Sequence, residues 1–374
     1  MTRLSFLLVF TCISLFTSAQ KYYLFIGTYT NTGSKGIYVY NFDATNGNVQ
    51  WISNTDSANN PSYLTVSKNG NYVYAVNETS GANPGRVSAY SFNKKNGKLH
   101  FLNTQFSGGE APCYVATSMD GKWLTVANYS SGSATAFRIN KNGSLQPYAQ
   151  LIQDTGGSIN KARQESAHVH ETVFSPDNGY LLTPDLGTDK IMIYKFNPSA
   201  KKPLIPFNPA YISVTPGYGP RHITFHPNKK FAYLIGELSG KVNVYKYNNG
   251  NFLEIQSISA HPESFKGTIG SAEVYVSPDG KFLYASNRGD ENTITIFLIN
   301  TVTGKLKLRG YQPTLGKAPR HFMIDPSGNY LLVANQDSDN IVIFKRDKST
   351  GLLTATGKQI RIPKPVCLQL LPVN

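Results

Sequence analysis

Short segments in which apolar and polar side chains alternate follow one another along most of this chain. These segments are rich in Tyr, Val, Ile and Phe, and Gly, Asn, Asp and Pro separate them. The stretch from Gly219 to Glu237 is a clear example, because two such segments flank a turn at residues 227–229. Helical periodicity is hard to find anywhere. Alternation of period two between turn residues is typical of β-strands, so the pattern predicts an all-β protein built from hairpins.

The hairpin recurs at a regular interval. Its turn carries Pro176, Pro227, Pro278 and Pro326, which are 51, 51 and 48 residues apart. Each copy continues into a third alternating segment, and a fourth is expected after a Gly-Lys-Leu or Gly-Ser-Leu turn; seven third segments can be counted. Four antiparallel strands in a unit of about 50 residues match a β-propeller blade. The regular period therefore predicts a seven-bladed β-propeller rather than a β-sandwich with long loops.

The first copy of the repeat lacks an opening strand. A segment that could supply it lies near the other end of the sequence, where Pro365 to Pro372 resembles the opening strands of other copies. We therefore expect blade 1 to combine the N- and C-terminal strands. A ring closed in this way leaves no long unpaired edge, which suits a monomer.

The first residues have the pattern of an export signal. Arg3 precedes an apolar run from Leu4 to Phe16, and small residues follow up to Ala19. This pattern predicts a signal peptide over residues 1–19, a single propeller domain over residues 20–374, and a periplasmic or secreted protein. An N-terminal anchor is the alternative, although the run is shorter than the roughly 20 residues of a membrane span. No second run of that length follows, so no membrane span is expected after cleavage.

The net charge of +14 at pH 7 does not by itself indicate a nucleic-acid partner. Many lysines fall in turns, and no nucleic-acid-binding motif is recognisable, so the charge favours mild attraction to anions. Two cysteines remain after the signal, Cys113 and Cys367, and they allow at most one disulfide. They lack the spacing of metal ligands, and His168 with His170 gives only a weak metal signal. Neither a metal nor an organic cofactor is expected.

Two positions in each copy carry side chains that differ from blade to blade. The first is a pair that opens the innermost strand: Ser62-Tyr63, Cys113-Tyr114, His170-Glu171, Arg221-His222, Ala272-Glu273 and Arg320-His321. The second is the residue just past the second strand: Glu78, Tyr129, Leu186, Glu237, Arg288 and Gln336. The start of one strand and the end of its antiparallel partner lie at the same end of a sheet. Both positions should therefore surround one mouth of the central channel.

The ionisable residues at these positions form the expected site: His170, Arg221, Glu237, Glu273, Arg288 and Arg320, with His222 and His321 as further members. Adjacent residues of a strand point to opposite sides. Only one of each opening pair is therefore expected to face the channel, while the other packs between blades. An insertion between Gln150 and Ala167 breaks the period and is expected to form a loop beside the site.

Three arginines at one mouth suggest an anionic ligand or a developing oxyanion, because guanidinium groups match carboxylate and phosphate oxygens. A histidine and a carboxylate among them suggest general acid–base chemistry. No Gly-x-Ser-x-Gly signature of a serine nucleophile is present. The alternative interpretation is structural, because polar residues at blade tips also satisfy backbone groups and tie blades together.

Several motifs give the chain a family resemblance: FIGTYT at 25–30, HVHETVFSPD at 168–177, GPRHITFHPN at 219–228, IGEL at 235–238, SAEVYVSPDGKFLYASNRG at 271–289 and APRHFMIDPSGNYLLVANQ at 318–336. With these motifs the chain resembles the seven-bladed lactonase family that includes bacterial 6-phosphogluconolactonase and fungal carboxy-muconate lactonizing enzyme. The resemblance covers nearly the whole chain after the signal. It implies a catalytic set of His170, Arg221, Glu237 and Arg288.

The implied reaction is hydrolysis of a sugar δ-lactone to its aldonic acid, without metal or organic cofactor. Arg320 fits as a further contact for an anionic substrate, and Glu273, His222 and His321 are taken as further substrate-binding residues. Phosphogluconolactone is a cytosolic intermediate, whereas this chain carries an export signal, so a plain aldonolactone or another anionic lactone is also expected. Two alternatives remain open: an exported, non-enzymatic propeller that binds a glycan or protein, and a lactone-forming cycloisomerase.

Overall fold

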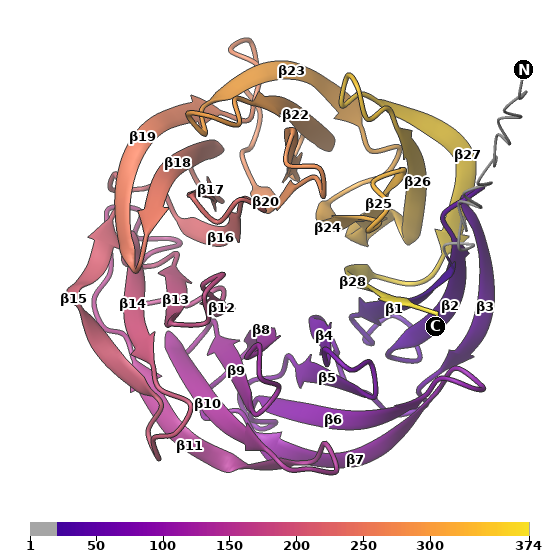
Figure 1. Ribbon diagram of the computed structural model, residues 1–374, viewed down its shortest axis with the longest axis vertical. Helices are drawn as coiled ribbons and strands as arrows, with labels where there is room; N and C mark the ends of the chain where they lie inside the picture. The colour runs from indigo at the N-terminus through magenta and orange to yellow at the C-terminus, as the bar shows by residue number, and fades with distance from the viewer. Residues whose placement is uncertain (1–20, 374) are drawn as a thin grey trace, which may run out of the picture.

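The computed structural model describes residues 21–373, which form a closed ring of seven four-stranded antiparallel sheets around a central channel (Figure 1). The predicted signal peptide over residues 1–19 lies outside the described residues. Within them, no helix has the length and apolar character needed to cross a membrane. Two adjacent blades are held together by packed side chains; for example, the rings of Phe25 and Phe92 meet edge to face with centroids 4.8 Å apart.

The blades follow one another along the chain, each numbered here from its innermost strand outward. Blade 1 contains β28 (Pro365–Pro372), β1 (Lys21–Thr28), β2 (Tyr38–Asp43) and β3 (Asn48–Asn54). Blade 2 contains β4 (Leu64–Val66), β5 (Tyr72–Asn77), β6 (Arg86–Asn93) and β7 (Lys98–Phe106), and blade 3 contains β8 (Pro112–Thr117), β9 (Trp123–Asn128), β10 (Ser133–Ile139) and β11 (Leu145–Gln153). Blade 4 contains β12 (Val173–Phe174), β13 (Tyr180–Asp185), β14 (Lys190–Phe196) and β15 (Leu204–Ser213).

The remaining blades have the same order. Blade 5 contains β16 (Pro220–Phe225), β17 (Phe231–Gly236), β18 (Lys241–Asn248) and β19 (Asn251–Ser259), and blade 6 contains β20 (Ser271–Val276), β21 (Phe282–Asn287), β22 (Thr293–Ile299) and β23 (Leu306–Pro313). Blade 7 contains β24 (Pro319–Ile324), β25 (Tyr330–Asn335), β26 (Asn340–Arg346) and β27 (Leu353–Arg361), with a short 3-10 helix, η1 (Gln336–Ser338), between β25 and β26. The predicted fold is therefore confirmed.

Blade 1 combines the two ends of the chain, as the sequence predicted. Strand β28 pairs antiparallel with β1, and Tyr22 lies opposite Pro372 while Gly27 lies opposite Cys367. Each inner strand of the ring thus belongs to a complete four-stranded sheet. The pairing with β28 covers the edge that β1 would otherwise present.

The innermost strands depart from regular alternation at the mouth of the channel. In β16, Pro220 pairs with Gly236 and His222 pairs with Ile235, so Arg221 is an extra residue that forms a β-bulge. The same shift occurs in β24, where Pro319 pairs with Asn335 and His321 with Ala334. A bulge places two residues of one strand opposite one residue of its partner and re-aims the side chains.

The bulges correct one expectation from the sequence. The side chains of both Arg221 and His222 turn into the channel, where Arg221 Nη1 lies 3.3 Å from the His222 ring. The rule of opposite sides therefore fails for this pair. In blade 4, His170 faces the cavity, and the Glu171 carboxylate accepts a hydrogen bond from the backbone N–H of Ile223 in blade 5 at 2.6 Å.

Conserved geometry within the repeat also explains the asparagines that end several second strands. Asn128, Asn287 and Asn335 are fully buried, and the side-chain amide of each donates to a backbone carbonyl of the loop entering its blade. They therefore connect the loop to the blade through hydrogen bonds. Cys113 and Cys367 are buried free thiols, so the possible disulfide is not formed.

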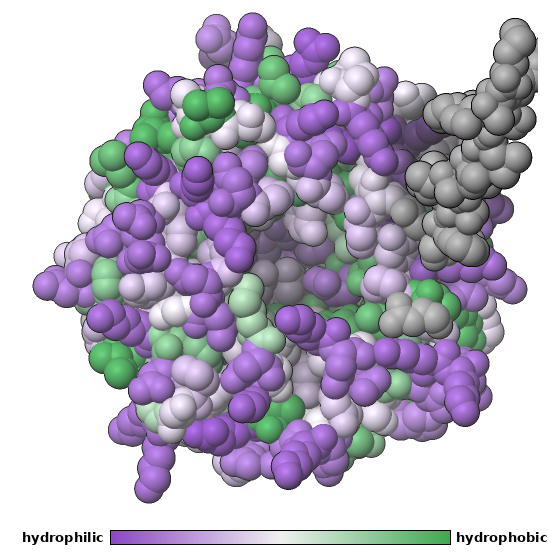
Figure 2. Space-filling model, in the orientation of Figure 1, coloured by the Kyte–Doolittle hydropathy of each residue, from purple (hydrophilic) through white to green (hydrophobic). Residues whose placement is uncertain are grey.

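One face of the ring is hollowed at its centre and bordered mostly by hydrophilic side chains (Figure 2). Such a depression is the usual place for a ligand in a propeller, because loops of several blades meet there while the strands beneath stay rigid.

Candidate active site

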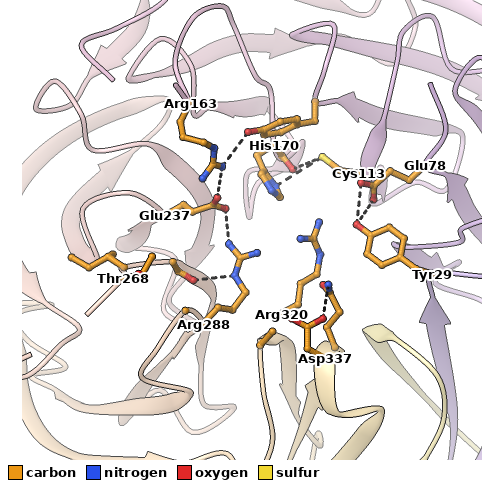
Figure 3. A pocket seen from close by; sticks show the side chains of 16 residues that line it. Tyr29, Glu78, Cys113, Arg163, His170, Glu237, Thr268, Arg288, Arg320 and Asp337 are labelled. Carbon is orange, nitrogen blue, oxygen red and sulfur yellow. Dashed lines mark hydrogen bonds and ion pairs between the residues drawn. The ribbon is translucent and has the colours of Figure 1, made fainter. Parts of the chain in front are cut away.

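A cavity of about 600 Å³ lies where the loops of several blades surround one mouth of the channel (Figure 3). Of the eight residues expected at the site, four line it: His170, Glu237, Arg288 and Arg320. Arg221 is buried beside the cavity and contacts Glu237. Further lining residues include Tyr29, Glu78, Cys113, Tyr129 and Arg163. Most of these residues lie within an innermost strand or come directly after the second strand of a blade, so the paired strands fix their positions.

Glu237 is the centre of the charged cluster. Its Oε2 lies 3.0 Å from Arg221 Nε and 2.8 Å from Arg288 Nη2, and its Oε1 lies 2.6 Å from Arg163 Nη2. Burial alone would raise the pKa of Glu237, but the three guanidinium groups outweigh it and hold this pKa well below its usual range. The carboxylate is therefore ionised and orients three cations.

The proximity of Arg221 and Glu237 follows from the hairpin register that the sequence predicted. Arg221 is only 1% exposed, and its Nη1 also donates to the backbone carbonyl of Ala272 in the next blade at 2.6 Å. Burial lowers the pKa of Arg288 to about 10 and Glu237 opposes this effect, so Arg288 is positively charged at neutral pH. The side chains of Arg221 and Arg288 present a fixed pair of guanidinium groups beside the cavity.

Arg163 comes from the insertion that breaks the repeat, so the insertion does lie beside the site. Its guanidinium also receives support from Tyr129, whose hydroxyl lies 3.3 Å from Nη2. The side chain is 44% exposed, whereas those of Arg221 and Arg288 are 2% and 17% exposed. The sequence did not single out Arg163, although a cation within a site-flanking insertion was the available signal.

His170 lies across the cavity from the arginine cluster and is almost fully buried. Its backbone N–H is held by the carbonyl of Pro184 at 3.0 Å, and its Nδ1 lies 3.9 Å from the Cys113 sulfur. The Tyr129 ring meets the imidazole edge to face at 5.5 Å. Burial, followed by the charges of Arg221 and neighbouring cations, lowers the pKa of His170 well below its usual value. The ring is therefore neutral at neutral pH and can accept a proton.

Arg320 projects from blade 7 toward the middle of the cavity (Figure 3). It packs near the face of the Tyr29 ring, with its guanidinium carbon 5.7 Å from the ring centroid. Among residues 21–373, no side chain forms an ion pair with it within 4.0 Å. The nearby Glu78 carboxylate instead accepts hydrogen bonds from the Tyr29 hydroxyl, at 3.0 and 2.9 Å. Arg320 thus offers a positive charge to whatever occupies the cavity.

His222, Glu273 and His321 form a second layer that does not line the cavity. Glu273 lies 3.1 Å from His222 Nδ1 and 3.5 Å from His321 Nε2, and all three side chains are buried. Burial raises the pKa of Glu273, lowers that of His222 and lowers that of His321 to about 4. Of the four residues expected to bind substrate, only Arg320 therefore reaches the cavity surface.

The part of the chain that the structure describes holds no cluster of three or more His, Cys, Asp or Glu side chains that could bind a metal ion. His168, the weak metal candidate, instead lies 3.1 Å from Glu165 and 3.1 Å from the Tyr129 carbonyl. Tyr29 and Arg163 were missed by the sequence reasoning, whereas Glu78, Cys113 and Tyr129 stood at the two predicted positions without entering the candidate set.

Comparisons with known proteins identify the family of this chain. A family model described as "Lactonase, 7-bladed beta-propeller" matches residues 23–370. A protein of Formosa agariphila named 6-phosphogluconolactonase is 41% identical over 349 residues, covering 93% of this chain and 99% of its own. A Bacillus subtilis protein of the same name is 36% identical, covering 94% of this chain and 99% of its own.

A solved structure of similar shape is the periplasmic gluconolactonase of Pseudomonas aeruginosa. It superposes with a TM-score of 0.90 at 36% identity, and the match covers 95% of this chain and 100% of that one. Each of these matches covers more than nine tenths of this chain. The chain therefore belongs to the seven-bladed β-propeller lactonase family.

Proposed function

We propose that this lactonase hydrolyses a sugar δ-lactone to its aldonic acid. The observation that carries the proposal is a buried, neutral histidine at the same cavity as two guanidinium groups that Glu237 orients, one of them buried and the other largely buried. The cavity volume of about 600 Å³ suits a small sugar, since ligand pockets of this kind commonly measure about 300 to 1,000 Å³. The names of the relatives, 6-phosphogluconolactonase and gluconolactonase, support the same substrate class.

In the proposed mechanism, His170 accepts a proton from water while the water oxygen attacks the lactone carbonyl. Arg221 and Arg288 stabilise the negative charge that develops on the carbonyl oxygen, which is usually the largest catalytic contribution. The ester C–O bond then breaks, and the protonated His170 returns its proton to the leaving ring oxygen. The products are a hydroxyl group and a carboxylic acid, which ionises in solution. No step of this route passes through a metal.

From the sequence, either His170 or Glu237 could act as the base. The charges around the two groups favour His170. Glu237 is ionised, but three guanidinium groups stabilise its charge so strongly that it is a poor proton acceptor. Its proposed role is to hold Arg221 and Arg288 in place. The unpaired Arg320 is proposed to contact a carboxylate, phosphate or ring oxygen on the far side of the substrate.

We also propose that the protein works outside the cytoplasm, because residues 1–19 have the pattern of a signal peptide and one relative is named periplasmic. A phosphorylated sugar lactone is scarce there. The preferred substrate is then a plain aldonolactone or a lactone with a carboxylate group.

A panel of phosphorylated, plain and carboxylated aldono-δ-lactones tests the proposal. The purified mature protein is expected to accelerate hydrolysis of at least one of them above the spontaneous rate, measured by proton release. Replacement of His170 by asparagine is expected to lower kcat by about 10²- to 10⁴-fold, the usual contribution of a general base. The exposed His100→Gln on β7 serves as the matched control. A protein that accelerates no lactone in the panel would favour the binding-scaffold alternative instead.

The pH profile gives a second expectation. Because the pKa of His170 lies well below 6.5, the ring stays unprotonated as the pH falls from about 8 through 6.5. Background-corrected kcat/KM should therefore stay constant over that range and decline only at lower pH. Initial rates at constant ionic strength provide the measurement. A half-loss of activity centred near pH 6.5 would contradict a buried His170 as the base.

A further inference from the structure

Behind Arg288, three buried side chains have the connectivity of a serine-hydrolase triad. His261 Nδ1 is hydrogen-bonded to the Glu291 carboxylate, and His261 Nε2 lies 3.1 Å from the Ser271 hydroxyl. The second Glu291 oxygen accepts a hydrogen bond from Thr293 Oγ1 at 2.7 Å. The chain order of these residues carries no recognised signature, and the mechanism proposed above does not use them.

The donors and acceptors argue against a nucleophilic serine. The Ser271 hydroxyl donates to Asn287 Oδ1 at 2.8 Å, and the amide nitrogen of Asn287 is already committed to the Ala260 carbonyl and to two threonine hydroxyls. The single hydroxyl proton is thus directed away from His261 and toward Asn287 Oδ1. A nucleophilic serine would instead donate its hydroxyl proton to the histidine that acts as its base.

The position of Ser271 leads to the same conclusion. Its side chain is fully buried, and no lactone could reach the hydroxyl through the backbone of the Gly270 segment. In the repeat, Ser271 opens the inner strand of blade 6 opposite Asn287, where blades 3 and 7 have Pro112 and Pro319 opposite their asparagines. A proline restricts its own backbone, whereas a serine at this place needs other contacts to hold it.

The backbone carbonyls of Gly270 and Ser271 contact Arg288 directly. Arg288 Nε donates to the Gly270 carbonyl at 2.9 Å, and its Nη2 lies 3.5 Å from the Ser271 carbonyl. The same guanidinium meets Glu237 at 2.8 Å on its other side. The direction of Arg288 is therefore set by one carboxylate and by the two carbonyls at the start of β20.

His261 also anchors the loop between β19 and β20. The Phe265 ring stacks on the His261 imidazole with centroids 5.1 Å apart. A side chain at Gly240 would collide with this imidazole, because a Cβ there would lie 2.3 Å from its Cδ2. His261 thus fits between two blades and the loop, and Glu291 fixes its orientation.

We propose that Glu291, His261 and Ser271 are positioning residues that hold the Gly270 and Ser271 carbonyls against Arg288, and that they do not form a second hydrolytic centre. This inference rests on the proposed function in assigning Arg288 to the oxyanion. A displacement of about 1 Å in a catalytic group can cost on the order of 10²-fold in rate, so the chain of hydrogen bonds is expected to influence kcat without touching substrate.

The kinetic test replaces Glu291 by glutamine and Ser271 by alanine. Glu291→Gln is expected to lower kcat about 10- to 100-fold with KM nearly unchanged, because ground-state contacts remain. Ser271→Ala keeps both carbonyls and is expected to lower kcat by less than about tenfold, whereas loss of a nucleophilic serine would cost about 10⁶-fold. The exposed Glu263→Gln in the same loop is the matched control and should behave as wild type.

Two further measurements do not depend on turnover. Incubation with a fluorophosphonate, followed by peptide mass spectrometry, is expected to leave Ser271 unmodified, and a labelled Ser271 would overturn the proposal. Crystal structures of wild type and of both variants should show Arg288 in contact with the Gly270 carbonyl in wild type and displaced from it in Glu291→Gln, with a smaller displacement in Ser271→Ala. If wild type hydrolyses no lactone, the proposed function fails while these structures still decide the positioning role. An unmoved Arg288 together with unchanged kcat in both variants would refute it.

Discussion

Replacement of Arg221 by alanine is expected to lower kcat/KM for the lactone by about 10²- to 10³-fold, the usual effect of removing one oxyanion donor. The ring should stay folded, because Arg288 and Arg163 remain to neutralise Glu237. Arg221→Lys is expected to recover only a small part of the activity, since an ammonium group cannot contact both Glu237 and the Ala272 carbonyl as the guanidinium does. Steady-state kinetics and thermal unfolding of each variant provide the measurements.

Arg309→Ala on the exposed side of β23 is the control for this series, because it removes an arginine of blade 6 that is remote from the cavity. It should match wild type in both rate and melting temperature. Undiminished turnover in Arg221→Ala would remove Arg221 from the mechanism and leave Arg288 as the oxyanion donor. Loss of folding would instead be visible as a lost thermal transition.

Replacement of Glu237 by glutamine is expected to affect stability as well as rate. It leaves three guanidinium groups, two of them largely buried, without their shared carboxylate. Removing one partner of a buried ionic cluster typically costs about 3 to 5 kcal/mol. Activity should also fall strongly, because Arg221 and Arg288 lose the anchor that orients them. Chemical denaturation at neutral pH and lactone kinetics measure the two effects.

The stability difference between wild type and Glu237→Gln should itself depend on pH. The folded-state pKa of Glu237 is depressed below the usual value of 4.5, so ionisation of this group favours the folded state above that pH. The advantage of wild type is therefore complete above about pH 5 and shrinks as the pH falls toward the folded-state pKa. Exposed Glu110→Gln, near the same mouth, should show no such difference. Equal unfolding free energies for wild type and Glu237→Gln at pH 7 would contradict the central role of this carboxylate.

The sequence predicted the ring and much of the site because both depend on strand periodicity. The sixteen-residue separation of Arg221 and Glu237 follows from one hairpin, and the structure places their side chains 3.0 Å apart. Closure of blade 1 was predictable for a similar reason, since the strand at Pro365–Pro372 repeats the pattern of other inner strands. Regular elements of this kind leave a signal at every second residue.

The other parts of the site depend on features that leave no periodic signal in the sequence. The β-bulge at Arg221 removes the expected alternation at this pair, so the sequence could not separate the residues of the cavity from the layer of His222, Glu273 and His321 beneath it. Arg163 belongs to an insertion without a counterpart in the other copies, so no repeat could fix its place. The choice between His170 and Glu237 as proton acceptor required the number of cations around each, which only the folded arrangement provides.

The joining of both chain ends in blade 1 sets the order in which the site can be completed during synthesis. Tyr29 at the cavity rim receives its backbone partner from Lys364, which lies immediately before β28. Blades 2 to 7 are each continuous in sequence and can form in turn as the chain emerges N-terminal end first, yet β1 has no inner neighbour until the final strand emerges. The cavity is thus assembled last, after translation of the whole propeller, and partly synthesised chains carry the arginine cluster without a finished rim.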